Sequence, residues 1–216
     1  MLSIHTIVNK PVPSNCFVLY DKLVGHECIV VDPGSRCADE LFAFLEEEGL
    51  VPKYIVLTHE HFDHCWGVNE LVKKYQIPIV CSALCAECIK NDKRNCSVFY
   101  DNHERFVINT ETVSLESLNY VLSFAGSELC FFNILGHTDA SVCFTLGKLL
   151  FTGDTLIKDL RTVTKLPTGS VAKLHESMDF LRDLQGNGYM VYPGHGVPFE
   201  LDGYDLELMI KGEVPR

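Results

Sequence analysis

The chain has 216 residues, a formal net charge of -11 at pH 7 and 47% hydrophobic residues. A chain of this length buries a substantial core in one domain without disulfide bonds. Its acidic balance argues against nucleic acid and against an anionic membrane surface as partners, because both bind clusters of Lys and Arg. One or two bound divalent cations would offset part of this negative charge.

The first half of the chain reads as strands that alternate with helices. Strands are predicted at residues 4–8, 15–20, 28–32, 54–57 and 79–81, with a further short strand at 106–108. Pro and Gly between the first three strands favour an antiparallel start. Helices are predicted at residues 36–48 and 66–75, with helical character over 82–95. Ser35 and Gly49 are the predicted caps of the first helix.

The second half repeats this order. Strands are predicted at residues 120–124 and 129–135, with a hairpin signal at Ala-Gly-Ser 125–127 between them. Further strands are predicted at 141–145, 149–152 and, as the last strand, 189–192. Helices are predicted at 170–184 and 204–210. No linker divides the chain, so we predict a single domain over residues 1–216 with two related halves, about 1–115 and 116–216. The fold class is α/β, a four-layer αβ/βα sandwich with its site at one edge of the two sheets.

Ligand-type residues are concentrated at residues 58–64, Thr-His-Glu-His-Phe-Asp-His, directly after the strand at 54–57. His59 and His61 lie two residues apart, so their side chains point the same way in extended backbone. Asp63 continues this alternation, and His64 points to the other side. The spacing favours two adjacent metal subsites over one. Imidazole and carboxylate ligands suit zinc, iron or manganese.

Three later segments each deliver one further ligand-type residue from a strand into a Gly-containing turn. They are Leu-Gly-His-Thr-Asp at 135–139, Phe-Thr-Gly-Asp-Thr at 151–155 and Tyr-Pro-Gly-His-Gly at 192–196. The residues delivered are His137, Asp154 and His195. Glycine in such turns permits close approach of the backbone to an ion. The other histidines, His5, His26, His103 and His175, are assigned no functional role.

The ten cysteines are interpreted as reduced thiols. The chain begins MLSIH, without the charged and apolar segments of a secretory signal, and no apolar run approaches the ~18–20 residues that span a bilayer. We therefore expect a cytoplasmic protein. Cys81, Cys85, Cys88 and Cys96 are interpreted as small buried apolar residues. A structural zinc site is the alternative, although their spacing lacks two C-x-x-C pairs.

The motifs T-H-x-H-x-D-H, G-H-T, T-G-D and P-G-H-G, together with Val-Asp-Pro-Gly at 31–34, resemble those of metallo-β-lactamase-fold hydrolases. The chain is most similar to the glyoxalase II-like (hydroxyacylglutathione hydrolase-like) branch. The resemblance implies two divalent metal ions, zinc by preference, with iron or manganese as alternatives. It implies a first metal on His59, His61 and His137, and a second on Asp63, His64 and His195. Asp154 would bridge the two, together with a hydroxide.

The resemblance also implies roles for residues around the ligands. Asp63 would orient the hydroxide or relay its proton, and Asp32 would support the histidine loop from behind the ligands. Arg161 and Lys165 are the available cations for an anionic substrate. A cysteine often found in true β-lactamases of this fold is replaced by Asp154, which argues against antibiotic hydrolysis. The implied reaction is metal-dependent hydrolysis of a thioester or related ester of a small anionic molecule.

Several alternatives stay open at this point. A persulfide dioxygenase-like oxidoreductase would hold one iron on His59, His137 and Asp154. A phosphodiesterase or a non-catalytic metal-binding protein of the same fold would share the motifs. Glyoxalase II carries a C-terminal helical extension that helps to bind glutathione, and we expect this chain, which ends at Arg216, to lack it. The oligomeric state is not predicted.

Overall fold

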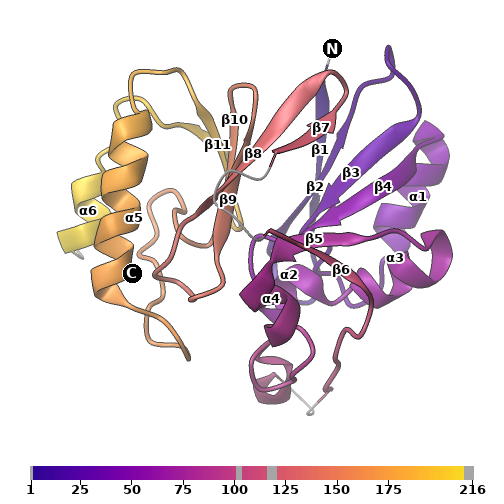
Figure 1. Cartoon of the computed structure of the whole chain (residues 1–216), viewed down its shortest axis with the longest axis horizontal. Helices are drawn as coiled ribbons and strands as arrows, with labels where there is room; N and C mark the ends of the chain where they lie inside the picture. The colour runs from indigo at the N-terminus through magenta and orange to yellow at the C-terminus, as the bar shows by residue number, and fades with distance from the viewer. Residues whose placement is uncertain (1, 101–103, 116–120, 212–216) are drawn as a thin grey trace. The chain divides into compact units, whose positions relative to one another are not determined.

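The computed structural model describes residues 2–100, 104–115 and 121–211. Two compact units divide the chain, Met1–Leu115 and Glu116–Arg216. Each unit contains one six-stranded sheet with helices (Figure 1). The α/β fold class is therefore confirmed. His103 and Tyr120, the first residue of a predicted strand, lie outside the described residues.

The sheet of the first unit is antiparallel at one side and parallel at the other. Its strands are β1 (Ser3–Val8), β2 (Asn15–Tyr20), β3 (Glu27–Val31), β4 (Val51–Val56), β5 (Ile79–Ser82) and β6 (Thr112–Leu115), in that spatial order. The first two pairs are antiparallel, as predicted, and the pairs from β3 to β6 are parallel. Parallel strands place their carboxyl ends at one edge of the sheet, where open α/β sheets bind ligands. Asp32 follows β3 at this edge, and the histidine loop follows β4.

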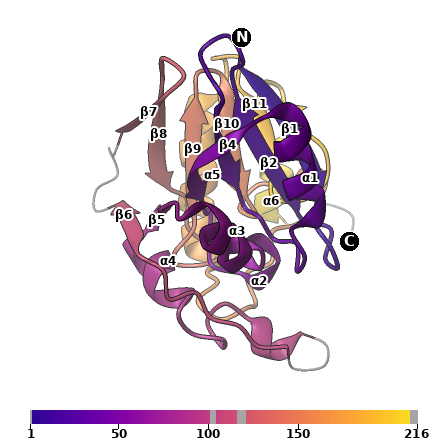
Figure 2. The ribbon, with the colours of Figure 1, turned by 90° about the vertical axis from the view of Figure 1, so that its right-hand side faces the viewer.

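Four α-helices and a short 3-10 helix accompany this sheet. They are α1 (Asp39–Glu48), α2 (Phe62–Cys65), α3 (Val68–Tyr75), α4 (Ala83–Cys88) and η1 (Ser97–Phe99). Helices α1 and α3 lie on the same face of the sheet, as Figures 1 and 2 show. Leu41 and Leu45 of α1 and Leu71 of α3 are buried, so each helix turns an apolar stripe inward.

The start of α1 differs from the prediction. The helix begins at Asp39, and the residue before it, Ala38, forms no side-chain cap. Ser35 does not cap it, because its hydroxyl accepts a hydrogen bond from the Lys10 backbone N–H and donates one to the Asn9 side chain. Gly49 ends the helix in the left-handed conformation, at φ 64°, as predicted.

Two strand predictions in the first unit are also corrected. Strand β4 begins at Val51, three residues earlier than predicted. The strand predicted at 106–108 is wrong: Phe106 stacks on Trp66, with ring centroids 5.6 Å apart, and the Ile108 N–H bonds to the carbonyl of Ile89. The apolar character of this stretch therefore serves side-chain packing. The sixth strand lies at Thr112–Leu115, where half-buried side chains gave no clear alternation.

The sheet of the second unit is antiparallel except for one pair. Its strands are β7 (Val121–Phe124), β8 (Ser127–Asn133), β9 (Val142–Leu146), β10 (Leu149–Gly153), β11 (Met190–Pro193) and β12 (Phe199–Glu200), in the order β12-β11-β10-β9-β8-β7. The β10–β11 pair is parallel. The predicted hairpin between β7 and β8 is confirmed, with Ala125 and Gly126 both at positive φ. Strand β12 follows the strand that was predicted to be last.

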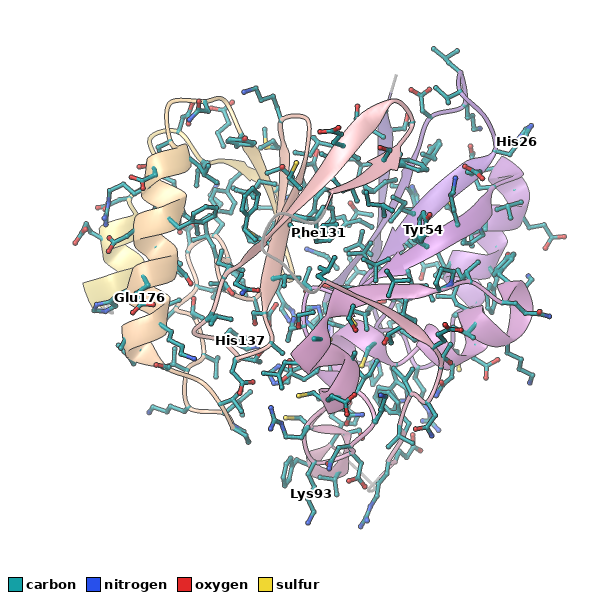
Figure 3. The ribbon with its side chains drawn as sticks, viewed as in Figure 1. His26, Tyr54, Lys93, Phe131, His137 and Glu176 are labelled. Atoms are coloured by element: carbon teal, nitrogen blue, oxygen red, sulfur yellow. The ribbon has the colours of Figure 1, made fainter. Side chains whose placement is uncertain are left out.

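Helices α5 (Val171–Leu184) and α6 (Leu206–Lys211) lie on one face of this second sheet (Figure 1). Ser170 caps α5 by accepting a hydrogen bond from the Lys173 N–H. Met178 and Leu181 of α5 pack in the core of the unit with Cys143. Figure 3 shows Glu176 on the outer side of α5. In the described ranges, no helix is long and apolar enough to cross a membrane.

Candidate metal centre

The histidine loop joins β4 to α2 in the first unit. The ring centroid of His59 lies 4.8 Å from that of His61 and 4.2 Å from that of His64. The predicted extended alternation fails after His61, because residues 62–65 form the helix α2. Two backbone hydrogen bonds form this turn: the His64 N–H donates to the His61 carbonyl, and the Phe62 N–H donates to the Asn95 carbonyl. His64 is therefore positioned by a helical turn and not by strand alternation.

Asp32 lies directly behind this loop and is 2% exposed. Its Oδ1 accepts a hydrogen bond from the Thr58 N–H at 2.8 Å, and its Oδ2 accepts one from the Thr58 hydroxyl at 2.6 Å. His64 Nδ1 lies 3.1 Å from the same Oδ2. A carboxylate acceptor at Nδ1 holds the proton there and leaves Nε2 free of hydrogen, the form that binds a metal.

Thr58 extends this arrangement to a second histidine. Its hydroxyl donates to Asp32 and lies 3.1 Å from His59 Nδ1, so it accepts the proton of that nitrogen. One carboxylate thus sets the proton position of His64 directly and of His59 through Thr58. The sequence analysis identified the Thr-His motif but did not predict this relay, which depends on the parallel pairing of β3 and β4.

Asp63 and His64 are neighbours at the start of α2. Asp63 Oδ2 lies 3.7 Å from His64 Nε2. Two ligands of a tetrahedral zinc ion, each about 2.0–2.1 Å from it, lie roughly 3.4 Å apart. The separation is therefore close to that of two ligands on one ion, and the donor set of carboxylate and imidazole suits zinc, iron and manganese.

Cysteine supplies no further ligand in this unit. The Cys65 thiol donates to the Glu60 carbonyl at 3.3 Å, and burial, followed by the nearby carboxylates of Asp63 and Asp32, raises its pKa well above the usual value. Cys81 and Cys85 are fully buried. Among the described residues, no cysteine belongs to a cluster with metal-ligand spacing. The interpretation as buried apolar residues is confirmed for Cys81, Cys85, Cys88 and Cys96.

In the second unit, glycines deliver the three predicted ligand residues from strand ends. Gly136 has a φ of 132° and packs so closely on α5 that a Cβ atom would lie 2.6 Å from Leu174 Cα. Gly153 ends β10 at φ 50°, immediately before Asp154. The Gly194 N–H then bonds to the Gly153 carbonyl at 2.8 Å, which ties the loop of His195 to that of Asp154.

These turns bring two histidines to one carboxylate oxygen. Oδ2 of Asp154 lies 3.6 Å from Nε2 of His137 and 3.4 Å from Nε2 of His195. Both distances exceed the usual N–H···O length of about 2.9–3.0 Å. Both also match the roughly 3.4 Å that separates two ligands of one ion. The Asp154 carboxylate can therefore bind a metal ion together with either histidine.

The proton position of His137 is set by the loop that follows Asp154. Its Nδ1 donates to the carbonyl of Val163 at 2.9 Å, which directs Nε2 toward Asp154. Figure 3 shows His137 in the loop that follows β8. The Val163 contact uses a backbone atom and had no signal in the sequence. Arg161 and Lys165 lie in the same loop as Val163, and both are exposed.

Comparison with known proteins identifies the family. A model described as "Metallo-beta-lactamase superfamily" matches residues 9–122, more than half of the chain. The chain belongs to the metallo-beta-lactamase superfamily. The family predicted from the sequence motifs is thereby confirmed.

Individual superfamily members are similar to the chain at modest identity. A hydroxyacylglutathione hydrolase of Edwardsiella ictaluri is 28% identical over 75% of this chain and 55% of its own length. The chain thus spans about half the length of this relative. The crystal structure of BLEG-1 B3 metallo-beta-lactamase has a TM-score of 0.83 at 25% identity, over 92% of this chain and 94% of that chain.

A further structure shows the same fold at lower identity. The structure of TTHA1623 in a di-iron-bound form has a TM-score of 0.76 at 22% identity, and covers 97% of this chain and 98% of that chain. The superfamily fold and a His/Asp group capable of binding metal ions are therefore established for this chain.

Proposed function

We propose that this chain is a hydrolase that holds two divalent metal ions and cleaves a thioester or related ester of a small anionic molecule. The observation that carries the proposal is the position of Asp154, whose Oδ2 lies 3.6 Å and 3.4 Å from His137 and His195. A carboxylate oxygen placed between two histidines supports the proposal, because it can serve as a ligand that two metal ions share. The similarity to a hydroxyacylglutathione hydrolase supports the choice of thioester.

The proposed ligands follow the order of the superfamily motifs. The first ion would be held by His59, His61 and His137, and the second by Asp63, His64 and His195, with Asp154 shared. Zinc is the proposed metal. Iron and manganese are the alternatives, because the same donors suit them and the similar TTHA1623 structure is a di-iron form.

Metal ions held by these residues would supply a water molecule activated near neutral pH and polarisation of a substrate carbonyl. The chain's own residues supply orientation and proton control. Asp63, part-buried beside His64, would orient the attacking water and take its proton. Asp32 and Thr58 keep hydrogen off Nε2 of His64 and His59, so that both nitrogens stay available as ligands.

Substrate recognition is assigned to the loop that follows Asp154. Arg161 and Lys165 are exposed there and offer positive charge to an anionic group. The Val163 side chain lies between them in sequence and is 50% exposed, so the loop also offers apolar surface. The Val163 carbonyl also holds His137 in place. A substrate that contacts this loop would therefore contact the segment that positions a proposed metal ligand. We place the protein in the cytoplasm, where its ten thiols would stay reduced.

A substrate panel with one variant pair tests this proposal. Purified protein is assayed with acyl thioesters, including acylglutathiones, and with a phosphodiester, a β-lactam and glutathione persulfide. We expect thioester hydrolysis that Asp154→Asn lowers by more than about 100-fold. Asp159→Asn is the matched control, because Asp159 is exposed and has a positive φ that Asn tolerates. Oxygen consumption with the persulfide, without hydrolysis, would support the oxidoreductase instead.

A further inference from the structure

A buried hydrogen-bond network joins the loop between β1 and β2 to the metal-ligand region of the first unit. Its two central side chains are Asn9, which is 2% exposed, and Ser14, which is 0% exposed. Nδ2 of Asn9 donates to the Ser14 hydroxyl at 2.9 Å and to the Asp32 carbonyl at 3.1 Å. The Asn9 N–H also donates to the Ser14 carbonyl at 2.8 Å, which closes the loop.

The network ends on the main chain of Asp63. The Ser14 hydroxyl accepts from Asn9 and, in turn, donates a short hydrogen bond to the Asp63 carbonyl. The N–H that would ordinarily reach the Asp63 carbonyl, that of Gly67, donates to the Pro33 carbonyl at 2.8 Å instead. Ser14 therefore ties the loop between β1 and β2 to the main chain of Asp63.

Close packing makes this connection rigid. A Cβ atom at Gly34 would overlap the Asp63 carbonyl and would lie 2.9 Å from Nδ2 of Asn9. The turn at residues 33–35 is thus pressed against the main chain of Asp63 on one side and against Asn9 on the other. The same turn follows Asp32, so the network fixes the backbone of Asp63 relative to that of Asp32.

We propose that Asn9 and Ser14 are positioning residues that hold the Asp63 carboxylate in place for the second metal ion. This inference rests on the proposed function, in which Asp63 binds that ion and orients the attacking water. Residues of the surrounding shell typically alter metal affinity or activity by about 10–100-fold when removed. Both side chains are buried away from solvent, so we expect their removal to change kcat and the second binding step and to leave KM nearly unchanged.

The experiment compares Ser14→Ala with Ser97→Ala. Ser97 is the matched control: its hydroxyl is equally buried, bonds to the Asp92 and Phe106 carbonyls in the same unit, and contacts no proposed ligand. Zinc is titrated into metal-free protein against a chromophoric chelator. We expect Ser14→Ala to weaken the second equivalent by about 10–100-fold. The first equivalent should change by less than about threefold, and Ser97→Ala should leave both steps unchanged.

A second set of variants separates positioning from general stability. Asn9→Ala removes the other partner of the Asn9–Ser14 hydrogen bond. This variant serves as the test if Ser14→Ala does not fold. The double variant should bind the second ion no more weakly than the worse single variant, because the two residues act in one network. Ser14→Thr, which keeps the hydroxyl, should recover most of the second-ion affinity. Equal weakening of both equivalents, or the same pattern in Ser97→Ala, would overturn the inference.

Failure of the proposed function gives a different result. Wild-type protein that binds fewer than two ions, or hydrolyses no ester, would refute the two-metal hydrolase. The positioning of Asp63 is then judged on metal-free protein by hydrogen exchange of the amides at residues 62–65. We expect faster exchange in Ser14→Ala and wild-type exchange in Ser97→Ala. Unchanged exchange in Ser14→Ala would reject the role of Ser14.

Discussion

The substitution Asp32→Asn replaces one carboxylate oxygen by an amide nitrogen directly behind the histidine loop. Asp32 has a φ of 49°, which Asn adopts readily, so the backbone should be preserved. Oδ1 of the new amide can still accept the hydrogen bond from the Thr58 N–H. Its amide nitrogen, however, places hydrogen donors where Oδ2 accepted from Thr58 and faced His64.

The expected consequence is a proton shift on two histidines. With a donor facing it, His64 Nδ1 must become an acceptor, and the ring proton moves to Nε2. The Thr58 hydroxyl, now accepting from the amide, can donate to His59 Nδ1 and shift that proton as well. Both Nε2 atoms would then carry hydrogen and would have to lose it before binding an ion.

The magnitude follows from these contacts. A 10–100-fold loss of metal affinity, typical for such a partner, corresponds to about 1.4–2.7 kcal/mol. In the metal-free protein, the three hydrogen bonds to the buried Asp32 carboxylate become weaker neutral ones, and we expect a loss of about 1–3 kcal/mol in the free energy of unfolding.

Chelator competition measures the metal affinity, and chemical denaturation in excess EDTA measures the stability. Asp202→Asn is the control: Asp202 is an exposed carboxylate that accepts from the Gly186 and Gly188 N–H groups. It should leave zinc affinity unchanged. Wild-type zinc affinity in Asp32→Asn, with the protein folded, would refute the reasoning about proton position.

Three further predictions concern the second unit. Gly136→Ala should lower the free energy of unfolding by more than about 2 kcal/mol in denaturant titration. The new Cβ would press on the Leu174 backbone, and residue 136 has a φ of 132°, which alanine rarely adopts. Unchanged stability would contradict this packing. Burial raises the pKa of the Cys143 thiol to about 12, so the unfolded chain loses this proton first. The contribution of this thiol to stability is fully present below pH ~8.5 and is lost at up to ~1.4 kcal/mol per pH unit toward pH 12, beside similar losses at other buried thiols such as Cys28. Cys143→Ala should flatten that decline in urea titrations from pH 8 to 11, and an unaltered slope would exclude Cys143 as its source. The double variant Arg161→Ala/Lys165→Ala should raise KM for an anionic thioester by about tenfold, since each exposed charge contributes about 0.2–1 kcal/mol. KM for a neutral thioester should stay unchanged. Equal effects on both substrates would show that the loop does not recognise charge.

The sequence predicted those parts of the structure that depend on local chemistry. Gly49 ends α1 and Ala125-Gly126 forms the hairpin turn, because each needs only one local backbone conformation. The family could be predicted from ordered motifs for the same reason: each motif is a short run in which a glycine or a strand end delivers a ligand.

What the sequence did not predict depends on contacts between distant segments. Ser35 has the chemistry of a helix cap but bonds to Asn9 and Lys10, which β1–β2 pairing brings close. Thr58 relays from Asp32 to His59 only because β3 and β4 run side by side. The Val163 carbonyl fixes His137 through a backbone atom, and every residue has such an atom, so the residue type at 163 does not indicate this contact. Residues 106–108 are apolar because Phe106 packs on Trp66, and a run of apolar residues alone does not distinguish such a packed loop from a strand.

Metal content of the purified protein tests the two-metal proposal most directly. After dialysis against metal-free buffer, elemental analysis of the wild type and of Asp154→Ala gives the number of ions per chain. We predict close to two ions in the wild type and no more than one in Asp154→Ala, because Asp154 lies 3.6 Å and 3.4 Å from His137 and His195 and would serve both ions. A wild type with one ion or none, or an Asp154→Ala variant that retains two, would contradict it.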